Sequence, residues 1–114
     1  ASIANNLAFF ATLTGRDATL AERLARANHA AYSTDANYTA TLAFVLLMKD
    51  DANGAMVLLR PLASQWQKQP AIAFAYGLTL AAVGRKDEAR APLTSLAGTE
   101  LTTREEELIR NALN

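Results

Sequence analysis

The sequence predicts an all-α fold built from stacked pairs of helices. Hydrophobic residues make up 51% of the 114 residues, and Ala and Leu, both strong helix formers, dominate them, whereas only 5 Gly and 3 Pro interrupt the pattern. The chain also resembles itself at a spacing of 34 residues. The matching pairs are Ala43 and Gly77, Leu46 and Leu80, Ala55 and Ala89, Leu59 and Leu93, and Leu62 and Leu96. A period in this range is typical of stacked two-helix units.

The first two helices are expected at 2–14 and 19–31. In the first, Leu7 and Phe10 recur at helical spacing, and the pattern ends at Gly15. In the second, leucines and alanines share one face and charged residues lie opposite. Together they form the first predicted pair.

The second pair is expected at 36–48 and 54–66. The connector 32–35 ends in small polar residues that can cap the helix that follows. The polar segment 49–54 forms the turn between the two helices.

Two further helices and a final one complete the pattern. Pro70 opens the fifth helix, 70–83, at a position where its missing N–H needs no partner. The sixth is expected at 88–97. The segment Thr103–Glu106 has the spacing of a capping box and opens the last amphipathic helix, 103–113.

Several residues resemble the tetratricopeptide repeat signature. They are Ala73, Tyr76, Gly77, Leu80, Gly84, Ala89, Leu93 and Leu96, with weaker copies earlier in the chain. The resemblance implies a right-handed α–α superhelix of three repeats with a terminal capping helix. The boundaries are 2–35, 36–69 and 70–101, followed by the helix 103–113. It also implies that Gly77 faces Ala89, so that the two helices of a pair pack closely.

The chain departs from the family pattern in two ways. The bulky aromatic residue expected early in each first helix is replaced by Ala4, Thr39 and Ala73. Pro61 and Pro92 fall inside second helices, where each removes a hydrogen bond at a cost of about 3 kcal/mol, so we expect those helices to start late or bend.

Charge is distributed unevenly along the chain. The segments 1–15, 36–48 and 69–84, which coincide with the three first helices, contain no charged side chain. In the resembled family, the first helices line a concave groove. On that basis we expect a partner to contact mainly apolar side chains of these helices, and Asn5 and Asn6 could form hydrogen bonds with a peptide backbone. The candidate partner-binding residues are Asn5, Phe9, Phe44, Leu47, Phe74 and Leu78. The alternative is that these helices lack charge simply because they are buried. A groove without cations excludes the carboxylate clamp that some members of the family use to hold chaperone C-termini.

Composition argues against several function classes. The net charge is +0, whereas nucleic-acid binding normally needs a basic surplus. The chain has no cysteine, which removes disulfides, thiolate metal sites and cysteine nucleophiles. Its longest uncharged window, 69–84, is too short and too polar to span a membrane. No cofactor is expected, and the compartment is left open.

Four polar or aromatic features have a structural and a functional reading. His29, Ser33 and Asp35 could form a hydrolytic trio, but no oxyanion hole accompanies them, so a packing histidine is preferred. The acidic run 50–54 lacks the ligand spacing of a calcium loop and is read as a capping turn. For Trp66 and Tyr38, packing is preferred to surface recognition. The run 105–107 is read as the first turn of a helix, or alternatively as an acidic docking edge.

The sequence therefore predicts a non-catalytic protein-interaction or scaffolding module that binds a peptide or helix on a neutral, apolar concave face. The alternative is a structural spacer or self-association segment. The chain begins Ala-Ser-Ile-Ala and is helical almost at once, so we expect it to be an excerpt of a longer protein. An enzyme is expected only if a catalytic domain lies outside this segment.

Overall fold

Helices account for most of the chain. The structure, a computed structural model, describes residues 7–114 and contains no β-strand in that range. Its elements are α1 (Leu7–Leu13), α2 (Ala18–Ala31), α3 (Ala36–Met48), α4 (Ala52–Leu59), η1 (Arg60–Gln65), α5 (Pro70–Ala82), α6 (Lys86–Thr94), η2 (Ser95–Gly98) and α7 (Thr103–Leu113), where η denotes a 3₁₀ helix. The all-α prediction is confirmed, and the predicted bounds of α3 and α7 match those observed. The start of the first predicted helix lies outside the described residues.

The two prolines in second helices act at the C-terminal ends of those helices. α4 stops before Pro61, and the chain continues as the 3₁₀ helix η1. α6 contains Pro92 and passes into η2 after Thr94. The expectation that these helices start late is wrong, because both start two residues earlier than predicted, and each passes into a 3₁₀ helix at its C-terminal end. A proline has no N–H to bond the carbonyl four residues back, so the α-helical ladder gives way near it.

The turn within each helix pair recurs with the same backbone conformation. Gly15, Asp50 and Gly84 have φ angles of 73°, 63° and 85°, in the left-handed region that favours glycine. Gly15 and Asp50 are 35 residues apart, and Asp50 and Gly84 are 34 apart. The sequence period is therefore also a period of backbone geometry.

Each of these turns is closed by the same long-range backbone hydrogen bond. The residue after the left-handed position donates its N–H to a carbonyl five residues back, as in a Schellman motif. The bonds run from Arg16 N to Ala11 O (2.9 Å), from Asp51 N to Leu46 O (2.8 Å) and from Arg85 N to Leu80 O (2.8 Å). Three helix ends are thus satisfied in the same way, so each of these first helices ends with the same backbone hydrogen bond.

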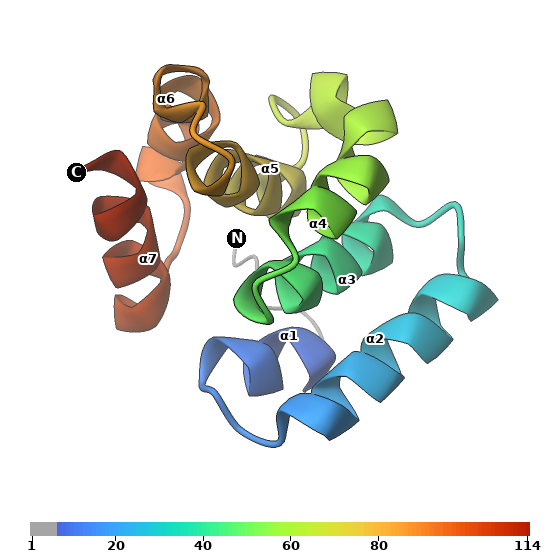
Figure 1. Cartoon of the computed structure of the whole chain (residues 1–114). Helices are drawn as coiled ribbons and strands as arrows, with labels where there is room; N and C mark the ends of the chain where they lie inside the picture. The colour runs from blue at the N-terminus through green and yellow to red at the C-terminus, as the bar shows by residue number, and fades with distance from the viewer. Residues whose placement is uncertain (1–6) are drawn as a thin grey trace.

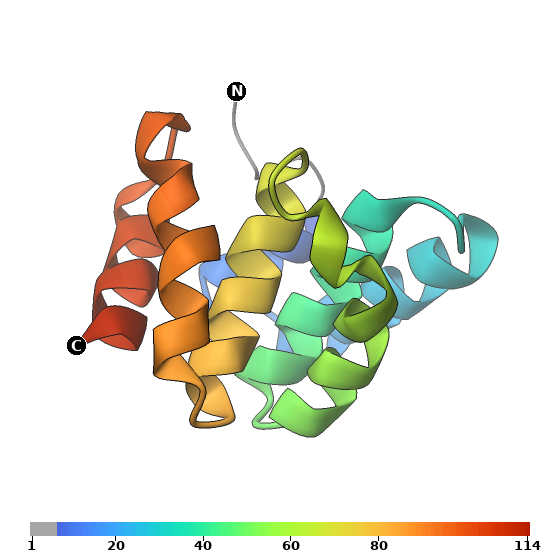
Figure 2. The ribbon, with the colours of Figure 1, turned by 90° about the horizontal axis from the view of Figure 1, so that it is seen from above.

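The helices pack in a repeating order. α3 packs against α1, α2, α4 and α5, and α5 packs against α3, α4, α6 and α7. α1, α3, α5 and α7 lie around a common centre, whereas α2, α4 and α6 lie outside them (Figure 1). Seen from above, α5, α6 and α7 stand side by side with nearly parallel axes (Figure 2). The principal extents, 32 × 28 × 27 Å, are nearly equal, so the helices form a compact rather than an extended arrangement.

One close approach between helices depends on a missing side chain. A Cβ atom placed on Gly77 of α5 would lie 2.5 Å from both Cγ and Cδ2 of Leu93 on α6. The resemblance implied that Gly77 faces Ala89. The atoms nearest to that Cβ position belong to Leu93, one helical turn beyond Ala89 on α6. Both Ala89 and Leu93 are buried, so α5 and α6 pack closely at Gly77.

Candidate functional site

The three phenylalanines predicted to line the groove meet in the core. The ring centroids of Phe9 and Phe44 lie 5.0 Å apart, those of Phe44 and Phe74 lie 5.4 Å apart, and those of Phe9 and Phe74 lie 5.9 Å apart. Their exposed fractions are 4%, 0% and 0%. The inner helices therefore bring these side chains together, but to fill the interior rather than to line an open surface. Asn5 and Asn6 lie outside the described residues.

The two predicted leucines border a cavity on the inner side. Leu47 of α3 and Leu78 of α5 are nearly buried and lie at a cavity of about 440 Å³ between α3, α5 and α7. We call this the inner cavity. Met48, which is 38% exposed, and Leu108 of α7 also line it. This cavity therefore borders two of the residues predicted to bind a partner.

The inner cavity is mainly apolar, and its polar lining residues are Lys86, Asn111 and Asn114. Lys86 and the terminal Asn114 border it, and the Lys86 ammonium donates a hydrogen bond to the Asn114 carbonyl. The remaining lining is mainly Leu, Met and Ala side chains of α3, α5 and α7. Such a surface favours apolar groups of a partner by the hydrophobic effect.

A second apolar surface, which the sequence did not indicate, lies on the outer side of the α1–α2 pair. We call it the outer groove. Leu7, Phe10 and Leu20 line it and are 69%, 47% and 41% exposed, and Ala11 and Leu24 complete its apolar lining. It has a volume of about 520 Å³. In the sequence, Leu20 and Leu24 share the apolar face of the second helix, and their spacing does not distinguish a covered face from an open one.

The residues considered for catalysis have structural contacts. His29 Nδ1 lies 3.2 Å from Thr39 Oγ1 and so joins α2 to α3. Asp35 caps α3, because its Oδ1 accepts the N–H of Asn37 at 2.9 Å. Among the described residues, no hydrogen bond joins either of them to Ser33. The preferred reading of His29 as a packing residue is confirmed.

The other polar and aromatic candidates also have structural roles. In the 50–54 turn, Asp51 Oδ1 accepts the N–H of Gly54 at 2.9 Å and caps α4, so the capping reading is confirmed. Trp66 packs against the hydrophobic core, as expected, and Tyr38 stacks on Tyr32 with centroids 5.3 Å apart.

The acidic run at the start of α7 does not form one exposed edge. The capping box joins Thr102 and Glu105, one residue before the predicted pair: Glu105 N donates to Thr102 Oγ1 (3.1 Å), and Thr102 N donates to Glu105 Oε1 (2.7 Å). Glu105 is fully buried, and Glu107 lies 3.6 Å from Arg104. The structure therefore favours the reading as a helix start.

Two ion pairs at the surface lower the pKa values of the carboxyl groups that take part in them. A hydrogen bond from Lys49, followed by one from Arg26, lowers the pKa of Glu22 below its usual value. The Lys49 Nζ to Glu22 Oε1 distance is 2.5 Å, and this contact links α2 to the end of α3. A hydrogen bond from Arg85 likewise lowers the pKa of Glu88. Neither group lies in the inner cavity or the outer groove.

No protein-family model, curated protein or solved structure matches this chain. Within residues 7–114, none of the helices has the length and apolar character needed to cross a bilayer.

Proposed function

We propose that this chain is a protein-interaction or scaffolding module of the tetratricopeptide type, which binds an apolar helix or peptide and catalyses no reaction of its own. The observation that carries this proposal is the recurrence of one turn geometry at Gly15, Asp50 and Gly84. Units that repeat in this way bury their faces against one another and leave extended surfaces for partners.

The inner cavity is the surface on which we place the partner. Its lining, from Leu47 and Met48 across Leu78 to Leu108, comes from three helices, so an inserted side chain would contact all three. An amphipathic helix presents apolar residues at intervals of three and four positions, which suits a short apolar depression of this kind. The phenylalanine cluster lies in the core behind this surface and supports it rather than contacting the partner.

A displayed random-peptide library, selected against the full chain, tests this proposal. We expect enriched peptides to carry apolar residues at helical spacing. Met48→Glu should abolish their binding, because it places a charge at the rim of the inner cavity. Val57→Glu is the matched control, since Val57 is a 67% exposed apolar residue of α4 outside both surfaces. Peptides that bind Met48→Glu as well as the unmodified chain would contradict the proposal.

The outer groove favours a second candidate function. The chain could serve as a structural spacer or self-association segment whose apolar surface is covered by neighbouring units or by a second copy. Sedimentation at increasing concentration distinguishes these forms. A mass that rises toward that of a dimer indicates self-association, whereas a constant monomer mass excludes it.

A further inference from the structure

The inner cavity adjoins a second cavity at the start of α7. The second cavity has a volume of about 620 Å³ and is lined by residues 12–15, by Met48 and by Arg104 of α7. Met48 also lines the inner cavity, so the two cavities meet at this side chain. Arg104 borders the second cavity and Leu108 borders the inner one. Because these residues are four positions apart on α7, they lie on one face of that helix. The two cavities therefore form one surface along α7, which we call the joined surface.

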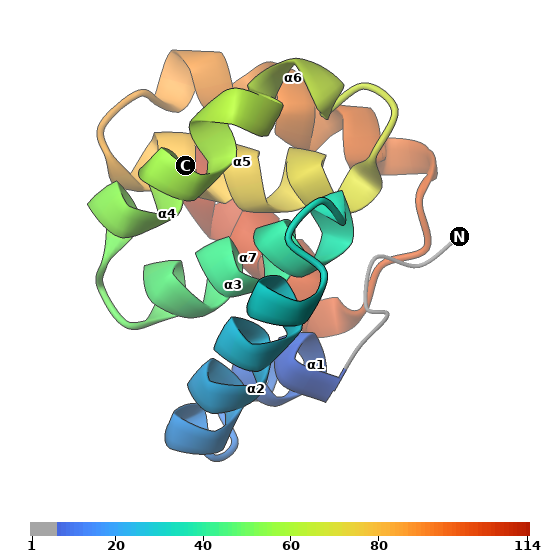
Figure 3. The same ribbon diagram turned by 90° about the vertical axis from the view of Figure 1, so that its right-hand side faces the viewer.

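The direction of α7 places a basic residue at each end of the joined surface. α7 runs from beside α1 toward the start of α6 (Figure 3). Arg104 lies in its first turn, and the carbonyl of Asn114, just beyond its end, accepts a hydrogen bond from Lys86 of α6. Ten residues separate Arg104 from Asn114, which corresponds to about 15 Å along a helix that rises about 1.5 Å per residue.

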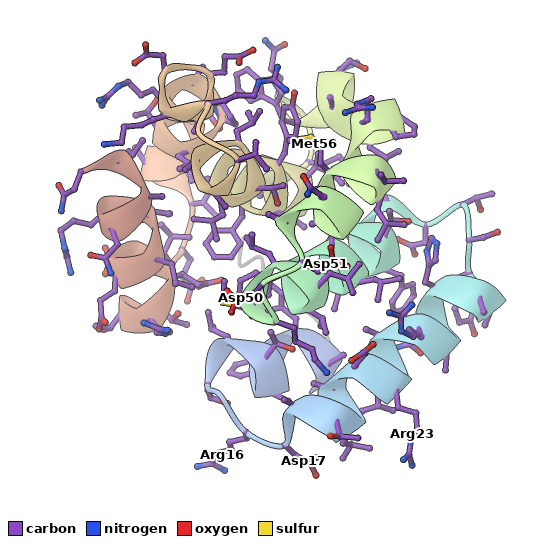
Figure 4. All side chains as sticks on the ribbon, viewed as in Figure 1. Arg16, Asp17, Arg23, Asp50, Asp51 and Met56 are labelled. Atoms are coloured by element: carbon purple, nitrogen blue, oxygen red, sulfur yellow. The ribbon has the colours of Figure 1, made fainter. Side chains whose placement is uncertain are left out.

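Both basic residues have hydrogen-bond donors to spare. The one ion pair of Arg104 among the described residues is with Glu107 at 3.6 Å, which is longer than a hydrogen bond. The Lys86 ammonium has three N–H groups, and the bond to the Asn114 carbonyl uses one of them. No Asp or Glu is among the described residues that line the two cavities, and Asp50, two residues beyond Met48, lines neither (Figure 4).

The joined surface is therefore apolar at its centre and basic at both ends. The expectation of a face without cations took only the first helices into account, whereas Lys86 and Arg104 come from the starts of α6 and α7. A partner that is complementary to this surface carries apolar groups in its middle and negative charges on either side of them.

We propose that the joined surface binds an amphipathic helix that has an apolar centre and an acidic residue at each end. The proposal rests on the proposed function and adds the charge of the partner to it. The apolar side chains enter the inner cavity beside Leu47 and Leu78, and the two carboxylates meet Lys86 and Arg104. Residues three turns apart on one face of a helix are about eleven positions and about 16 Å apart, which suits the length of α7 between the two cations.

Three synthetic helical peptides test the proposal on the full chain. They share an apolar centre and differ only at two positions, about eleven residues apart, that both carry Glu, Gln or Lys. Their affinities are measured by fluorescence anisotropy at low and at high salt. At low salt we expect the Glu peptide to bind about fivefold more tightly than the Gln peptide, and the Lys peptide to bind most weakly. The differences should shrink as salt is added, because the charges are at the surface.

Charge reversal supplies the decisive comparison. Lys86→Glu combined with Arg104→Glu should reverse the order, so that the Lys peptide binds most tightly. Each new glutamate lies in the first turn of a helix, where the helix dipole favours a negative charge, so we expect the variant to fold, and circular dichroism checks this. Arg23→Glu combined with Lys68→Glu is the matched control, since it changes the net charge equally. Neither residue lines the joined surface or forms an ion pair among the described residues, and Arg23 points away from the molecule (Figure 4). The control should keep the order of the unmodified chain.

The remaining outcomes separate this proposal from the proposed function. Lys86→Gln and Arg104→Gln are milder changes, and each should remove part of the preference for the Glu peptide. An order that survives charge reversal, or that the control reverses as well, would overturn the proposal. If the three peptides bind equally and Met48→Glu abolishes their binding, the apolar site of the proposed function holds and the acidic ends are refuted. If none of the peptides binds, both proposals fail.

Discussion

The first and third helix pairs share a turn but differ in their surroundings. Gly15 and Gly84 have nearly the same φ angle, and the same backbone hydrogen bond closes both turns. α5 lies between α3 and α4 on one side and α6 and α7 on the other, and its Phe74 is fully buried. Phe10 of α1 is 47% exposed, whereas Thr79 of α5, which occupies the equivalent position by the spacings of 35 and 34, is fully buried. The comparison shows that local sequence determines the turn, whereas position in the stack determines burial.

Truncating one phenylalanine in each pair should give the largest contrast. Phe74→Ala removes a ring packed against Phe9 and Phe44, and we expect it to destabilise the fold by about 3–5 kcal/mol through lost burial and the cavity left behind. Phe10→Ala removes a half-exposed ring and should lower the free energy of unfolding by about 1 kcal/mol or less. Urea denaturation followed by circular dichroism measures both. Equal losses would show that the outer face of α1 is part of the core in solution.

A smaller contrast is expected at the position where the helices of a pair approach most closely. Gly77 of α5 corresponds to Ala8 of α1 at spacings of 34 and 35 through Ala43. Gly77→Ala should destabilise the fold by about 1–2 kcal/mol, because overpacking against Leu93 outweighs the better helix propensity of alanine. Ala8→Gly should also destabilise the fold, by about 0.5–1 kcal/mol of backbone entropy and about 0.8 kcal/mol for the buried methyl group that it removes.

A double-mutant cycle identifies the cause of the Gly77 effect. In a Leu93→Ala background the clash is absent, so Gly77→Ala should become stabilising, by about 1 kcal/mol of helix propensity. If Gly77→Ala remains destabilising in that background, the contact with Leu93 is not what requires glycine.

The features that the sequence predicted well depend on local chemistry. The bounds of α3 and α7 follow from caps and hydrophobic periodicity within a few residues, and the turns at Gly15 and Gly84 follow from glycine at a left-handed position. Asp50 occupies the same conformation without glycine, and only the repeat spacing could have identified it.

The features that the sequence did not predict depend on curvature and on neighbours. Whether Phe44 and Phe74 line a groove or fill a core depends on how closely the inner helices approach one another, which the sequence of a single helix does not determine. The sequence did not predict that Glu105 is the buried member of three consecutive glutamates. The capping box was expected to pair Thr103 with Glu106, whereas in the structure it pairs Thr102 with Glu105. The outer groove was missed for a related reason, since Leu20 has a core-like spacing whether or not a neighbour covers it.

The smallest expected effect is a difference in how two ion pairs, one at the first helix pair and one at the third, make stability depend on pH. Glu22 is paired with Lys49, 27 residues away on another helix pair, whereas Glu88 is paired with Arg85, three residues away in the same turn. Both pairings lower the pKa of the carboxyl group in the folded state. A lowered folded pKa gives a contribution to stability that is present above the unfolded pKa and is lost as the pH falls through the folded pKa.

Unfolding should break the first pair more completely than the second, because a contact over 27 residues depends on the fold and one over three residues can persist in the unfolded chain. Lys49→Met should therefore raise the pKa of Glu22 and flatten the dependence of stability on acid pH. Arg85→Met should raise the pKa of Glu88 with less change in that dependence. Carboxyl titration by NMR, with urea denaturation between neutral and acid pH, measures both quantities. Equal flattening by the two variants would show that the Glu22–Lys49 pair is no more dependent on the fold than a pair within one turn.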